Sequence, residues 1–383
     1  MVAPLHVALL TTTLDVSGAE RVIALLADGL VREGYQVSVV GLQRRSGSLA
    51  HLIREPSVRV ADLGVSGQLD LGVIGRLRRW LIDERVTILY TFLFHGNVIG
   101  RLAGRAARVP FLLSSQQVAE WGNWPRRLLE RLTARWCDCI VAVSAGARDD
   151  VIARLGVSGD RVRVIVNAID VPSFEARTRP FERAREPGQI VLGSASRLAP
   201  EKDHATLVRG FAMAVELMPG LRLRLAGHGP LAESVSDLVA QLGLTSTVEL
   251  LGRIDDIHAF HDSLDIYVQP SRTEGLPVAV IEAMAMQRPV IATDVAGNRD
   301  VVVNNVTGWL IPPQSPAAWA AAIVEAATAP SAVQFGLAGR RRVEERFDAR
   351  TMVKDTVQLL EELRDGTRPR LRSSREPSGT SVR

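Results

Sequence analysis

Two glutamates bracket the most informative stretch of this 383-residue chain. Glu274 and Glu282 enclose seven residues, and Glu282 falls within residues 278–286, which are apolar on nearly every side of a helix. A helix of this kind is buried, so the Glu282 carboxylate needs donors that its apolar neighbours do not supply. Glu274 precedes the helix beside Gly275, where free backbone N–H groups attract anions. The pair predicts a polar binding site; the alternative is a helix cap and a locally bonded carboxylate.

Two cations follow the predicted strand at residues 190–194. Arg197 and Lys202 lie five positions apart, and Lys202 is one of only two lysines among 46 basic residues. Positive charge fixed at the end of a strand can stabilise negative charge that develops on a phosphate group. The alternative is a pair of solvated loop cations.

A histidine and a glycine in the first half are further candidates. His95 follows a predicted strand at residues 88–92, which places it at the edge of a cleft; the alternative is a core or capping histidine. Gly18 suits a loop whose backbone approaches a ligand closely, and suits an ordinary turn equally well.

Residues 227–232 compete as a dinucleotide-binding motif. They fit G-x-G-x-x-A, and Glu249 lies about 20 residues further on, as in nicotinamide-binding proteins. The motif follows the second predicted strand of its domain rather than the first, however, and Pro230 stands where the helix should begin. We therefore disfavour a nicotinamide cofactor.

Predicted strands alternate with predicted helices along most of the chain. Continuous apolar strands of this kind belong to parallel sheets covered on both faces. The pattern lapses at residues 170–188, which contain three prolines, and then restarts. We predict an α/β protein of two doubly wound domains facing one another across a cleft, with ligands at the carboxyl ends of the strands. The strands are expected at 5–11, 37–42, 88–92, 112–114, 140–143, 162–165, 190–194, 222–226, 248–250, 266–268 and 290–292.

The domains are assigned to residues 1–180 and 181–363. A helical segment at residues 337–363 is long enough to cross back onto the first domain. Residues 364–383 form a basic tail that we expect to be disordered.

Composition excludes several classes of protein. The chain is 46% hydrophobic and 23% charged, which is typical of a folded soluble protein. It has no apolar stretch of about 18 residues, and its start lacks the basic segment of a secretory signal. Its net charge of +4 comes without a basic stripe interleaved with aromatics, so we expect no nucleic-acid partner. Cys137 and Cys139 are too few for a disulfide scaffold or a zinc site, and a cytoplasmic location is expected.

These motifs together resemble those of the retaining, GT-B-fold glycosyltransferases of family 4 (group 1 type). Residues 274–282 resemble the family's E-x7-E signature, and the resemblance covers roughly residues 1–363. Three segments depart from the family pattern at one residue each: His228 stands where an acidic residue is usual, and Ala168 and Ser17 stand where glycine is common. The matching segments are residues 196–202 (donor-phosphate loop), 226–231 (the next strand and turn), 251–254 (nucleotide base), 166–170 (hinge) and 17–21 (glycine-rich loop).

The resemblance implies two Rossmann-like domains, with the acceptor bound by the first and a nucleoside diphosphate sugar by the second. It implies that Glu282 holds the ribose, that Glu274 and the Gly275–Leu276 backbone hold the sugar, and that Arg197 and Lys202 hold the diphosphate. His95 would contact the transferred sugar. The remaining residues implied in donor binding are Gly18, Gly252, Arg253 and Ile254.

A retaining, hexosyltransferase-type glycosyltransferase is therefore the predicted function. UDP is the nucleotide that the family uses most often, and the acceptor would be a glycan, a lipid-linked molecule or a small molecule. No D-x-D sequence occurs, which argues against the metal-dependent GT-A design, so we expect neither an essential metal nor another cofactor. The alternatives are a sugar-nucleotide epimerase on the same fold and a non-catalytic sugar-nucleotide-binding protein.

The helix expected after Asn123 raises the question of a membrane surface. Its apolar residues share one face at helical spacing, and arginines cover the rest, as in helices that lie in a membrane interface. This would place the protein at the inner face of the plasma membrane. We favour the alternative, a helix packed on its domain with a solvated arginine face. The apolar residues are Pro125, Leu128, Leu129, Leu132 and Trp136, with Trp121 and Trp124 upstream, and the arginines are Arg126, Arg127, Arg131 and Arg135.

Overall fold

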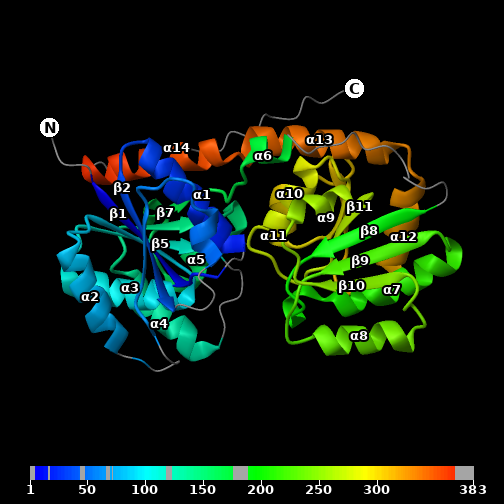
Figure 1. The fold of residues 1–383 in the computed structure, drawn as a ribbon, viewed down its shortest axis with the longest axis horizontal. Helices are drawn as coiled ribbons and strands as arrows, with labels where there is room; N and C mark the ends of the chain where they lie inside the picture. Colours follow the sequence, from blue (N-terminus) through cyan, green and yellow to red (C-terminus); the bar gives the residue numbers. More distant parts are fainter. Residues whose placement is uncertain are drawn as a thin grey trace.

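The computed structural model describes residues 5–15, 18–43, 48–65, 70, 72–117, 123–175 and 189–366, and within them it contains two parallel β-sheets. The first sheet has the strand order β3-β2-β1-β4-β5-β6-β7, and the second has the order β10-β9-β8-β11-β12-β13. Figure 1 shows the two sheets side by side, each flanked by helices. The predicted fold class, two doubly wound Rossmann-like domains, is confirmed.

The first sheet is covered on both faces because successive residues of its strands point to opposite sides. Val7 and Leu9 of β1 pack into a core with α1 and α14, whereas Ala8 and Leu10 pack into a second core with α2 and α3. The strands are β1 His6–Thr13, β2 Gln36–Gln43, β3 Arg59–Asp62, β4 Ile88–Phe92, β5 Phe111–Gln116, β6 Cys139–Ala142 and β7 Val162–Val164. The helices of this part are α1 Gly18–Arg32, α2 Gly72–Asp83, α3 Phe94–Ala107, α4 Trp124–Ala134, α5 Ala145–Leu155 and α6 Val171–Glu175, with 3-10 turns at Ser48–Leu52 and Gly159–Arg161.

The second sheet has the same layered plan. Leu192 of β8 packs with α7, α8 and α12 on one face, and the almost wholly buried α10 packs against the other face. The strands are β8 Ile190–Ala195, β9 Leu221–Ala226, β10 Val248–Gly252, β11 Ile266–Gln269, β12 Val290–Thr293 and β13 Gly308–Ile311. The helices are α7 His204–Leu217, α8 Ala232–Gln241, α9 Ile257–Asp262, α10 Val278–Ala285, α11 Ala296–Val301, α12 Pro316–Thr328, α13 Ser331–Arg346 and α14 Ala349–Arg364, and a 3-10 turn spans Pro200–Lys202.

Helix α14 joins the two halves by running back along the first one (Figure 1). Met352, Val353, Leu359 and Leu360 of α14 belong to the core that α1 and β1 build. The N–H of Ala349 donates to the carbonyl of Ile169 at 2.9 Å, so α14 is anchored at its start beside the link between the sheets. The last helix, which was expected to cross back onto the first domain, thus lies against α1 and β1.

Several predicted boundaries need correction. Residues 337–363, which were expected to be largely helical, are divided between two helices: α13 ends at Arg346, and Asp348 caps α14 by accepting from Arg350 N at 2.8 Å. Helix α10 begins at Val278, directly after Pro277, and ends at Ala285, shortly before Gln287 adopts a left-handed backbone with φ of 58°. Two strands were not predicted, β3 and β13; each has only four residues. The predicted domain boundary at residue 180, Ser17, Trp121 and residues 367–383 lie outside the described residues.

The α1–α14 contact generates a stability prediction. A Cβ added at Gly29 would lie 2.2 Å from Cγ2 of Val353, so Gly29→Ala should lower the melting temperature. Overpacking of this kind costs about 1–3 kcal/mol, which exceeds the roughly 0.5–1 kcal/mol that alanine gains over glycine in a helix. Adding Val353→Ala should restore part of the loss, as measured by calorimetry. If the loss of stability in the double variant equals the sum of the two single losses, residues 29 and 353 do not interact.

Candidate active site

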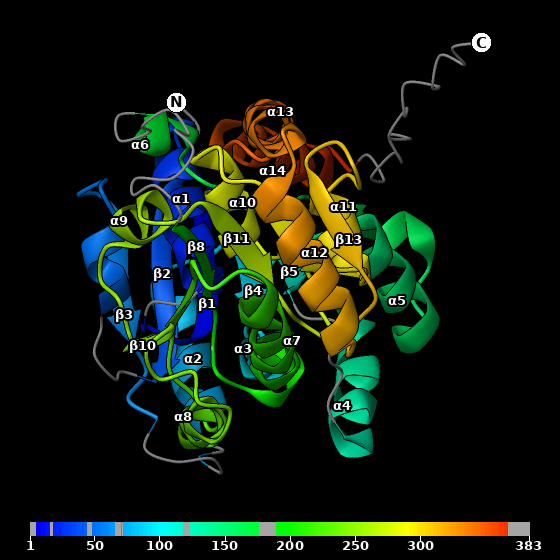
Figure 2. The same cartoon turned by 90° about the vertical axis from the view of Figure 1, so that its right-hand side faces the viewer.

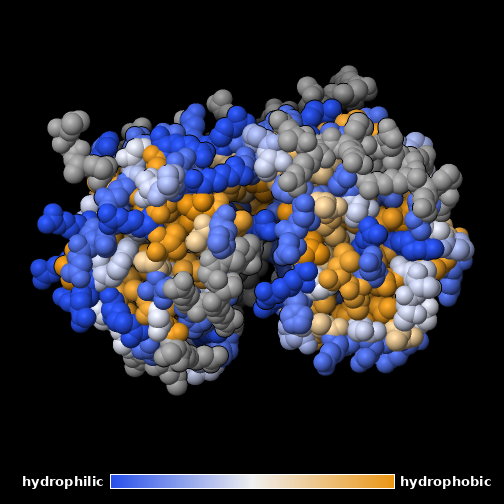
Figure 3. Space-filling view, in the orientation of Figure 1, coloured by the Kyte–Doolittle hydropathy of each residue, from blue (hydrophilic) through white to orange (hydrophobic). Residues whose placement is uncertain are grey.

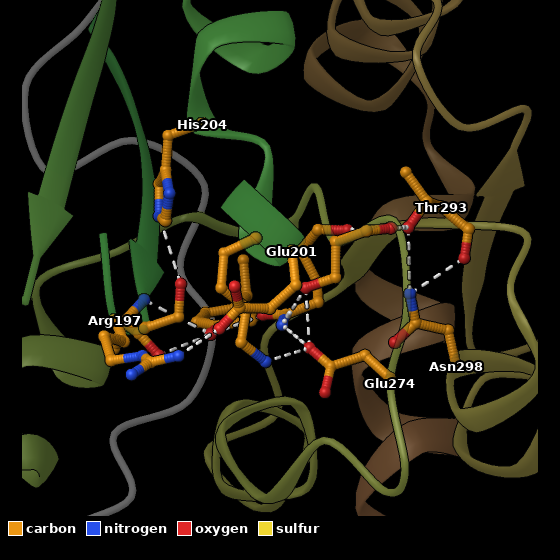
Figure 4. A network of polar contacts seen from close by, with 12 residues as sticks. Arg197, Glu201, His204, Glu274, Thr293 and Asn298 are labelled. Carbon is orange, nitrogen blue, oxygen red and sulfur yellow. Dashed lines mark hydrogen bonds and ion pairs between the residues drawn. The ribbon is translucent and has the colours of Figure 1, made fainter. Parts of the chain in front are cut away.

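Glu274 is a buried carboxylate that accepts three donors on one oxygen. Lys202 Nζ, Gln269 Nε2 and Ser271 Oγ each lie 2.6 Å from its Oε1. Figure 4 shows these contacts converging on one side of the carboxylate while the second oxygen points away. A carboxylate at 9% exposure requires such donors, since an unpaired buried charge is costly. Glu274 and Lys202, which were predicted as separate ligand contacts, therefore form one ion pair.

Strand β11 and the residues directly after it supply two of these donors. Tyr267 and Gln269 are two positions apart in the strand, so their side chains point to the same face of the sheet, and Ser271 follows the strand and accepts from Gln269 Nε2 at 3.0 Å. The Tyr267 hydroxyl donates to Gln269 Oε1 at 3.0 Å, and the Gln269 amide then donates to Glu274. Sequence reasoning missed these residues, although polar side chains at every second position after a buried strand were a usable signal.

The pKa of the Tyr267 phenol is affected by both glutamates. Burial raises the pKa of Tyr267 above its usual range, and the negative charges of Glu282 and Glu274 raise it further. Both carboxylates are thus within electrostatic reach of one buried phenol. The E-x7-E spacing brings the two side chains to the same end of β11.

Lys202 and Arg197 face different surroundings. Lys202 turns inward to Glu274, but Arg197 is 65% exposed at its side chain and pairs with Glu201 at 2.5 Å. Burial raises the pKa of Glu201, but the hydrogen bond from Arg197, a backbone hydrogen bond and the charges of Arg197 and Lys202 together lower it below its usual value. The N–H of Arg272 donates to the Glu201 carbonyl at 2.8 Å. The loops after β8 and β11 are therefore joined by backbone as well as by side chains.

A buried histidine supports the start of the β8 loop. His204 Nε2 lies 3.0 Å from Ser196 Oγ, directly before Arg197 (Figure 4). Burial, and then the positive charge of Lys202, lower the pKa of His204 to about 4. The ring is therefore neutral near pH 7 and holds the loop by a hydrogen bond rather than by charge.

The glycines of the loop after β9 are required by the protein's own packing. A Cβ at Gly227, whose φ is 138°, would lie 1.9 Å from the Ser196 carbonyl oxygen, and one at Gly229 would lie 2.3 Å from that of Leu198. The G-x-G spacing thus allows this loop to lie against the β8 loop. This explains the motif without a nicotinamide cofactor. The N–H of Gly227 also donates to Gly252 at 2.6 Å, which brings the predicted Gly252–Ile254 segment beside the same loops.

Helix α11 fixes the backbone of the Glu274 loop from behind. A Cβ at Gly297 would lie 2.6 Å from the Glu274 carbonyl oxygen, so only glycine permits this approach. Asn298 donates to the carbonyl of Thr293 at 2.8 Å, and Thr293 Oγ1 donates to the carbonyl of Ser271 (Figure 4). Sequence reasoning did not single out these residues, because Gly297 and Thr293 contact the Glu274 loop from more than 20 positions away.

Glu282 faces a different neighbour. It is 6% exposed on α10, and no hydrogen bond within the described residues satisfies its carboxylate. Its closest cationic candidate is His261 of α9, whose Nε2 lies 3.7 Å from Glu282 Oε2. A buried carboxylate with no bonded donor is suited to accept from hydroxyl groups of a ligand. Gly275 and Leu276 are buried between the two glutamates, with the Leu276 side chain in the core.

In the first domain, His95 lies in the first turn of α3, directly after β4. Its ring stacks edge-on to Phe94 with centroids 5.1 Å apart, and the guanidinium of Arg126 lies 4.9 Å from the centre of the Phe94 ring. Burial, and then the charge of Arg126, lower the pKa of His95, so that the imidazole is neutral near pH 7. Gly18 begins α1, and a Cβ there would meet no atom within 4 Å.

Figure 3 shows that the surface is hollowed along the junction of the two domains. Helices α5 and α11 contact one another across this junction. The loop after β11 and helix α10, which carry the glutamates, belong to one side of it, and the start of α3, which carries His95, belongs to the other. Among the residues that the structure describes, no hydrogen bond, ion pair or ring contact joins His95 to Glu274, so their shared role stays a prediction.

No group of three or more His, Cys, Asp or Glu side chains that could hold a metal ion occurs within the residues that the structure describes. Among the described helices, none is by itself long and apolar enough to cross a membrane. Helices α12 and α13 meet that test only jointly, across a bend of 96°.

Comparison with known proteins gives matches over nearly the whole chain. Residues 16–172 match the family "Glycosyltransferase Family 4", and residues 176–342 match "Glycosyl transferases group 1". The alpha-maltose-1-phosphate synthase of Mycolicibacterium smegmatis is 27% identical over 356 residues, which cover 84% of this chain and 89% of the synthase. An Escherichia coli UDP-Gal:alpha-D-GlcNAc-diphosphoundecaprenol alpha-1,3-galactosyltransferase is 23% identical over 316 residues, covering 77% and 81% of the two chains.

A solved structure shows the same fold. Anabaena HepE in complex with UDP and glucose superposes with a TM-score of 0.82, covering 94% of this chain and 100% of that chain at 19% sequence identity. The similarity extends over both domains, so the two-domain arrangement is shared and not only its halves.

The close approach of α11 generates a prediction about activity. Gly297→Ala should displace the Glu274 loop and lower kcat roughly 100-fold, the scale expected when reacting groups are misplaced by about 1 Å. Steady-state kinetics and a thermal melt would measure this. Gly75→Ala is the matched control, because a Cβ there meets nothing within 4 Å. Unchanged kcat in a folded Gly297→Ala variant would show that the loop position does not matter.

Proposed function

Because the chain belongs to the family 4, group 1 glycosyltransferases with the GT-B fold, which use nucleotide sugars, we propose that it transfers a sugar from a UDP-sugar with retention of configuration. The second domain binds the donor and the first binds the acceptor. The observation that carries the proposal is the Glu274–Lys202 pair, held where the loops after β8, β9 and β11 converge.

Each site residue has a proposed contact with the donor. Glu282, which lacks a bonded donor among the described residues, accepts from the ribose hydroxyls. The second oxygen of Glu274 and the Gly275–Leu276 backbone hold the sugar. The diphosphate lies against Lys202 and Arg197. The base lies against Gly252, Arg253 and Ile254, Gly18 lets its loop approach the donor, and His95 contacts the transferred sugar.

Lys202 is placed to act on the bond that breaks. The bond between the anomeric carbon and the diphosphate oxygen breaks with its electron pair on oxygen, so negative charge grows on the leaving phosphate. A fixed ammonium that already contacts Glu274 lies between the sugar and the phosphate and stabilises that charge. In this proposal the diphosphate competes with Glu274 for Lys202 when the donor binds.

Retention follows a front-face route in this proposal. Glu274 Oε1 already accepts three donors, which reduces its ability to attack the anomeric carbon. The leaving phosphate instead receives the proton of the acceptor hydroxyl, and that hydroxyl oxygen forms the new bond on the face from which the phosphate departs. No covalent enzyme intermediate is needed.

The acceptor is proposed to be a glycan or a lipid-linked molecule at the inner face of the plasma membrane. Support comes from the Escherichia coli relative, whose name specifies a diphosphoundecaprenol acceptor. The decisive assay supplies a panel of nucleotide sugars with and without acceptors and measures free nucleoside diphosphate. Release that an acceptor accelerates supports transfer, an altered sugar nucleotide indicates an epimerase, and binding without turnover indicates a non-catalytic protein.

Substitutions of the two glutamates should change different kinetic parameters. Glu282→Gln weakens contacts to the ribose, which does not react, so KM for the donor should rise about 10- to 150-fold with little change in kcat. This range corresponds to a charge-assisted hydrogen bond of roughly 1.5–3 kcal/mol. Glu274→Gln should lower kcat at least about 10-fold, because it alters the sugar contact and releases Lys202.

Glu216→Gln serves as the control for loss of one carboxylate, since Glu216 lies exposed on α7. Thermal melts must show all three variants folded before the kinetics are compared. Wild-type kcat and KM in both site variants would remove Glu274 and Glu282 from the donor site.

Activity should also survive chelation. The proposed charges on the diphosphate are met by Lys202 and Arg197 instead of by a divalent ion, so EDTA should change kcat less than twofold. A complete loss that magnesium or manganese restores would overturn the metal-independent mechanism.

A further inference from the structure

Helix α4 is turned the opposite way from the arrangement that its sequence favours. Its large apolar side chains are on the outside: Trp124 is 68% exposed, Leu128 and Leu129 are each 46% exposed, and Leu132 is 42% exposed. Its buried residues are Glu130, Thr133 and Ala134. At about 100° per residue these two sets occupy opposite sides of the helix. The helix does pack on its domain with a solvated arginine face, as the favoured interpretation has it, but the side that packs is the polar one and not the apolar one. Trp136 lies beyond the end of the helix.

A buried ion pair fixes this orientation. Arg101 of α3 is 1% exposed, and its Nη1 donates to Glu130 Oε2 at 2.5 Å and to Thr133 Oγ1 at 3.2 Å. Its Nε donates to Ser114 Oγ of β5 at 2.9 Å. Rolling α4 to bury its leucines would leave the Arg101 guanidinium unpaired in the interior, which is strongly unfavourable. The apolar face is thus held outward.

The exposed charges that α4 itself carries all have one sign. Arg126, Arg127, Arg131 and Arg135 are exposed on or directly after α4, and the one acidic residue of the helix, Glu130, is buried against Arg101. The exposed leucines and tryptophan are therefore bordered by arginines with no acid of the helix among them. This combination complements a surface that is anionic outside and apolar beneath.

We propose that α4 docks on an anionic lipid bilayer, with Trp124, Leu128, Leu129 and Leu132 in the headgroup–acyl boundary and the arginines on the lipid phosphates. Figures 1 and 2 show α4 at an edge of the first domain, remote from α14, where it projects from the body of the molecule. A planar membrane can therefore reach it. We name these four apolar residues, with Arg127, Arg131 and Arg135, the docking face.

The docking face continues to the candidate acceptor side. Arg126 lies over the Phe94 ring, and Phe94 contacts His95, so the start of α3 lies beside α4. Docking brings His95 to the bilayer surface. The inference rests on the proposed function in one respect, that His95 faces the acceptor; given that, the acceptor is presented by the membrane.

Co-sedimentation with liposomes tests the docking face. The full-length protein should sediment with vesicles of phosphatidylglycerol and phosphatidylcholine at low salt, and less with phosphatidylcholine alone. Arg127→Glu with Arg131→Glu should weaken binding about 30-fold or more, since each surface arginine contributes a factor of about five. Leu128→Ser with Leu132→Ser should weaken binding comparably without lowering the melting temperature, because both side chains are already exposed.

The matched control is Met213→Ser with Leu217→Ser on α7 of the second domain, where the side chains are 45% and 71% exposed. This variant should bind vesicles like the wild type. Equal weakening by the control and the α4 variants would show general hydrophobic adsorption and overturn the proposal. So would failure of the wild type to bind, or a concentration-dependent dimer that the Leu128 and Leu132 variant abolishes, because the face would then meet a second copy.

A parallel measurement of UDP binding by calorimetry separates this inference from the proposed function. The α4 variants should keep wild-type UDP affinity. Vesicle binding without any UDP binding would leave docking intact and remove the proposed donor. UDP binding without vesicle binding would overturn the docking proposal and leave the proposed donor intact.

Discussion

The candidate site depends on the burial of one carboxylate. Glu274 is removed from water, and its charge is stable there only because Lys202, Gln269 and Ser271 all donate to one oxygen. These donors come from two loops that are separated by about 70 residues in the chain, so satisfying Glu274 requires that the loops after β8 and β11 meet. The glycines at 227, 229 and 297 permit the backbone approaches that this meeting requires. The same constraint leaves the second oxygen available to a ligand.

The relation between the domains depends on contacts remote from that site. Arg163 pairs with Glu362 of α14, and Arg54 pairs with Asp170 near the link between the sheets at 2.8 Å. Across the junction, the Ser144 hydroxyl at the start of α5 interacts with Asp300 of α11, whose pKa is raised by burial. The domains are therefore joined by one anchored helix, a few polar contacts and the apolar packing of Val143 and Ile169 against the core around α10. Such an arrangement leaves the hollow between the domains open to a ligand that both of them contact.

Sequence reasoning succeeded where a property is local. Alternating apolar strands and helices predicted the fold class, because burial on both faces of a sheet leaves a direct pattern. It also marked Glu274, Glu282 and Lys202. The sequence did not reveal which residues contact them. Lys202 and Glu274 are 72 positions apart, and nothing in the sequence marks an uncharged residue such as Gln269 as a donor to a distant carboxylate. Strand β3 was missed because its four residues, Arg59–Asp62, lie at the sheet edge and are partly or fully exposed, so they carry no apolar run.

Helix α4 shows why amphipathic periodicity cannot decide which face is buried. The pattern defines an apolar side, and hydrophobic burial alone would place that side on the domain. The Arg101–Glu130 pair reverses the outcome, although its two residues are 29 positions apart and neither is conspicuous in the sequence. A buried ion pair adds little net stability compared with apolar packing, but removing one partner costs about 3–5 kcal/mol. Its effect here is therefore on orientation: it makes burial of the polar side obligatory, and the apolar side then remains exposed for whatever surface the helix meets.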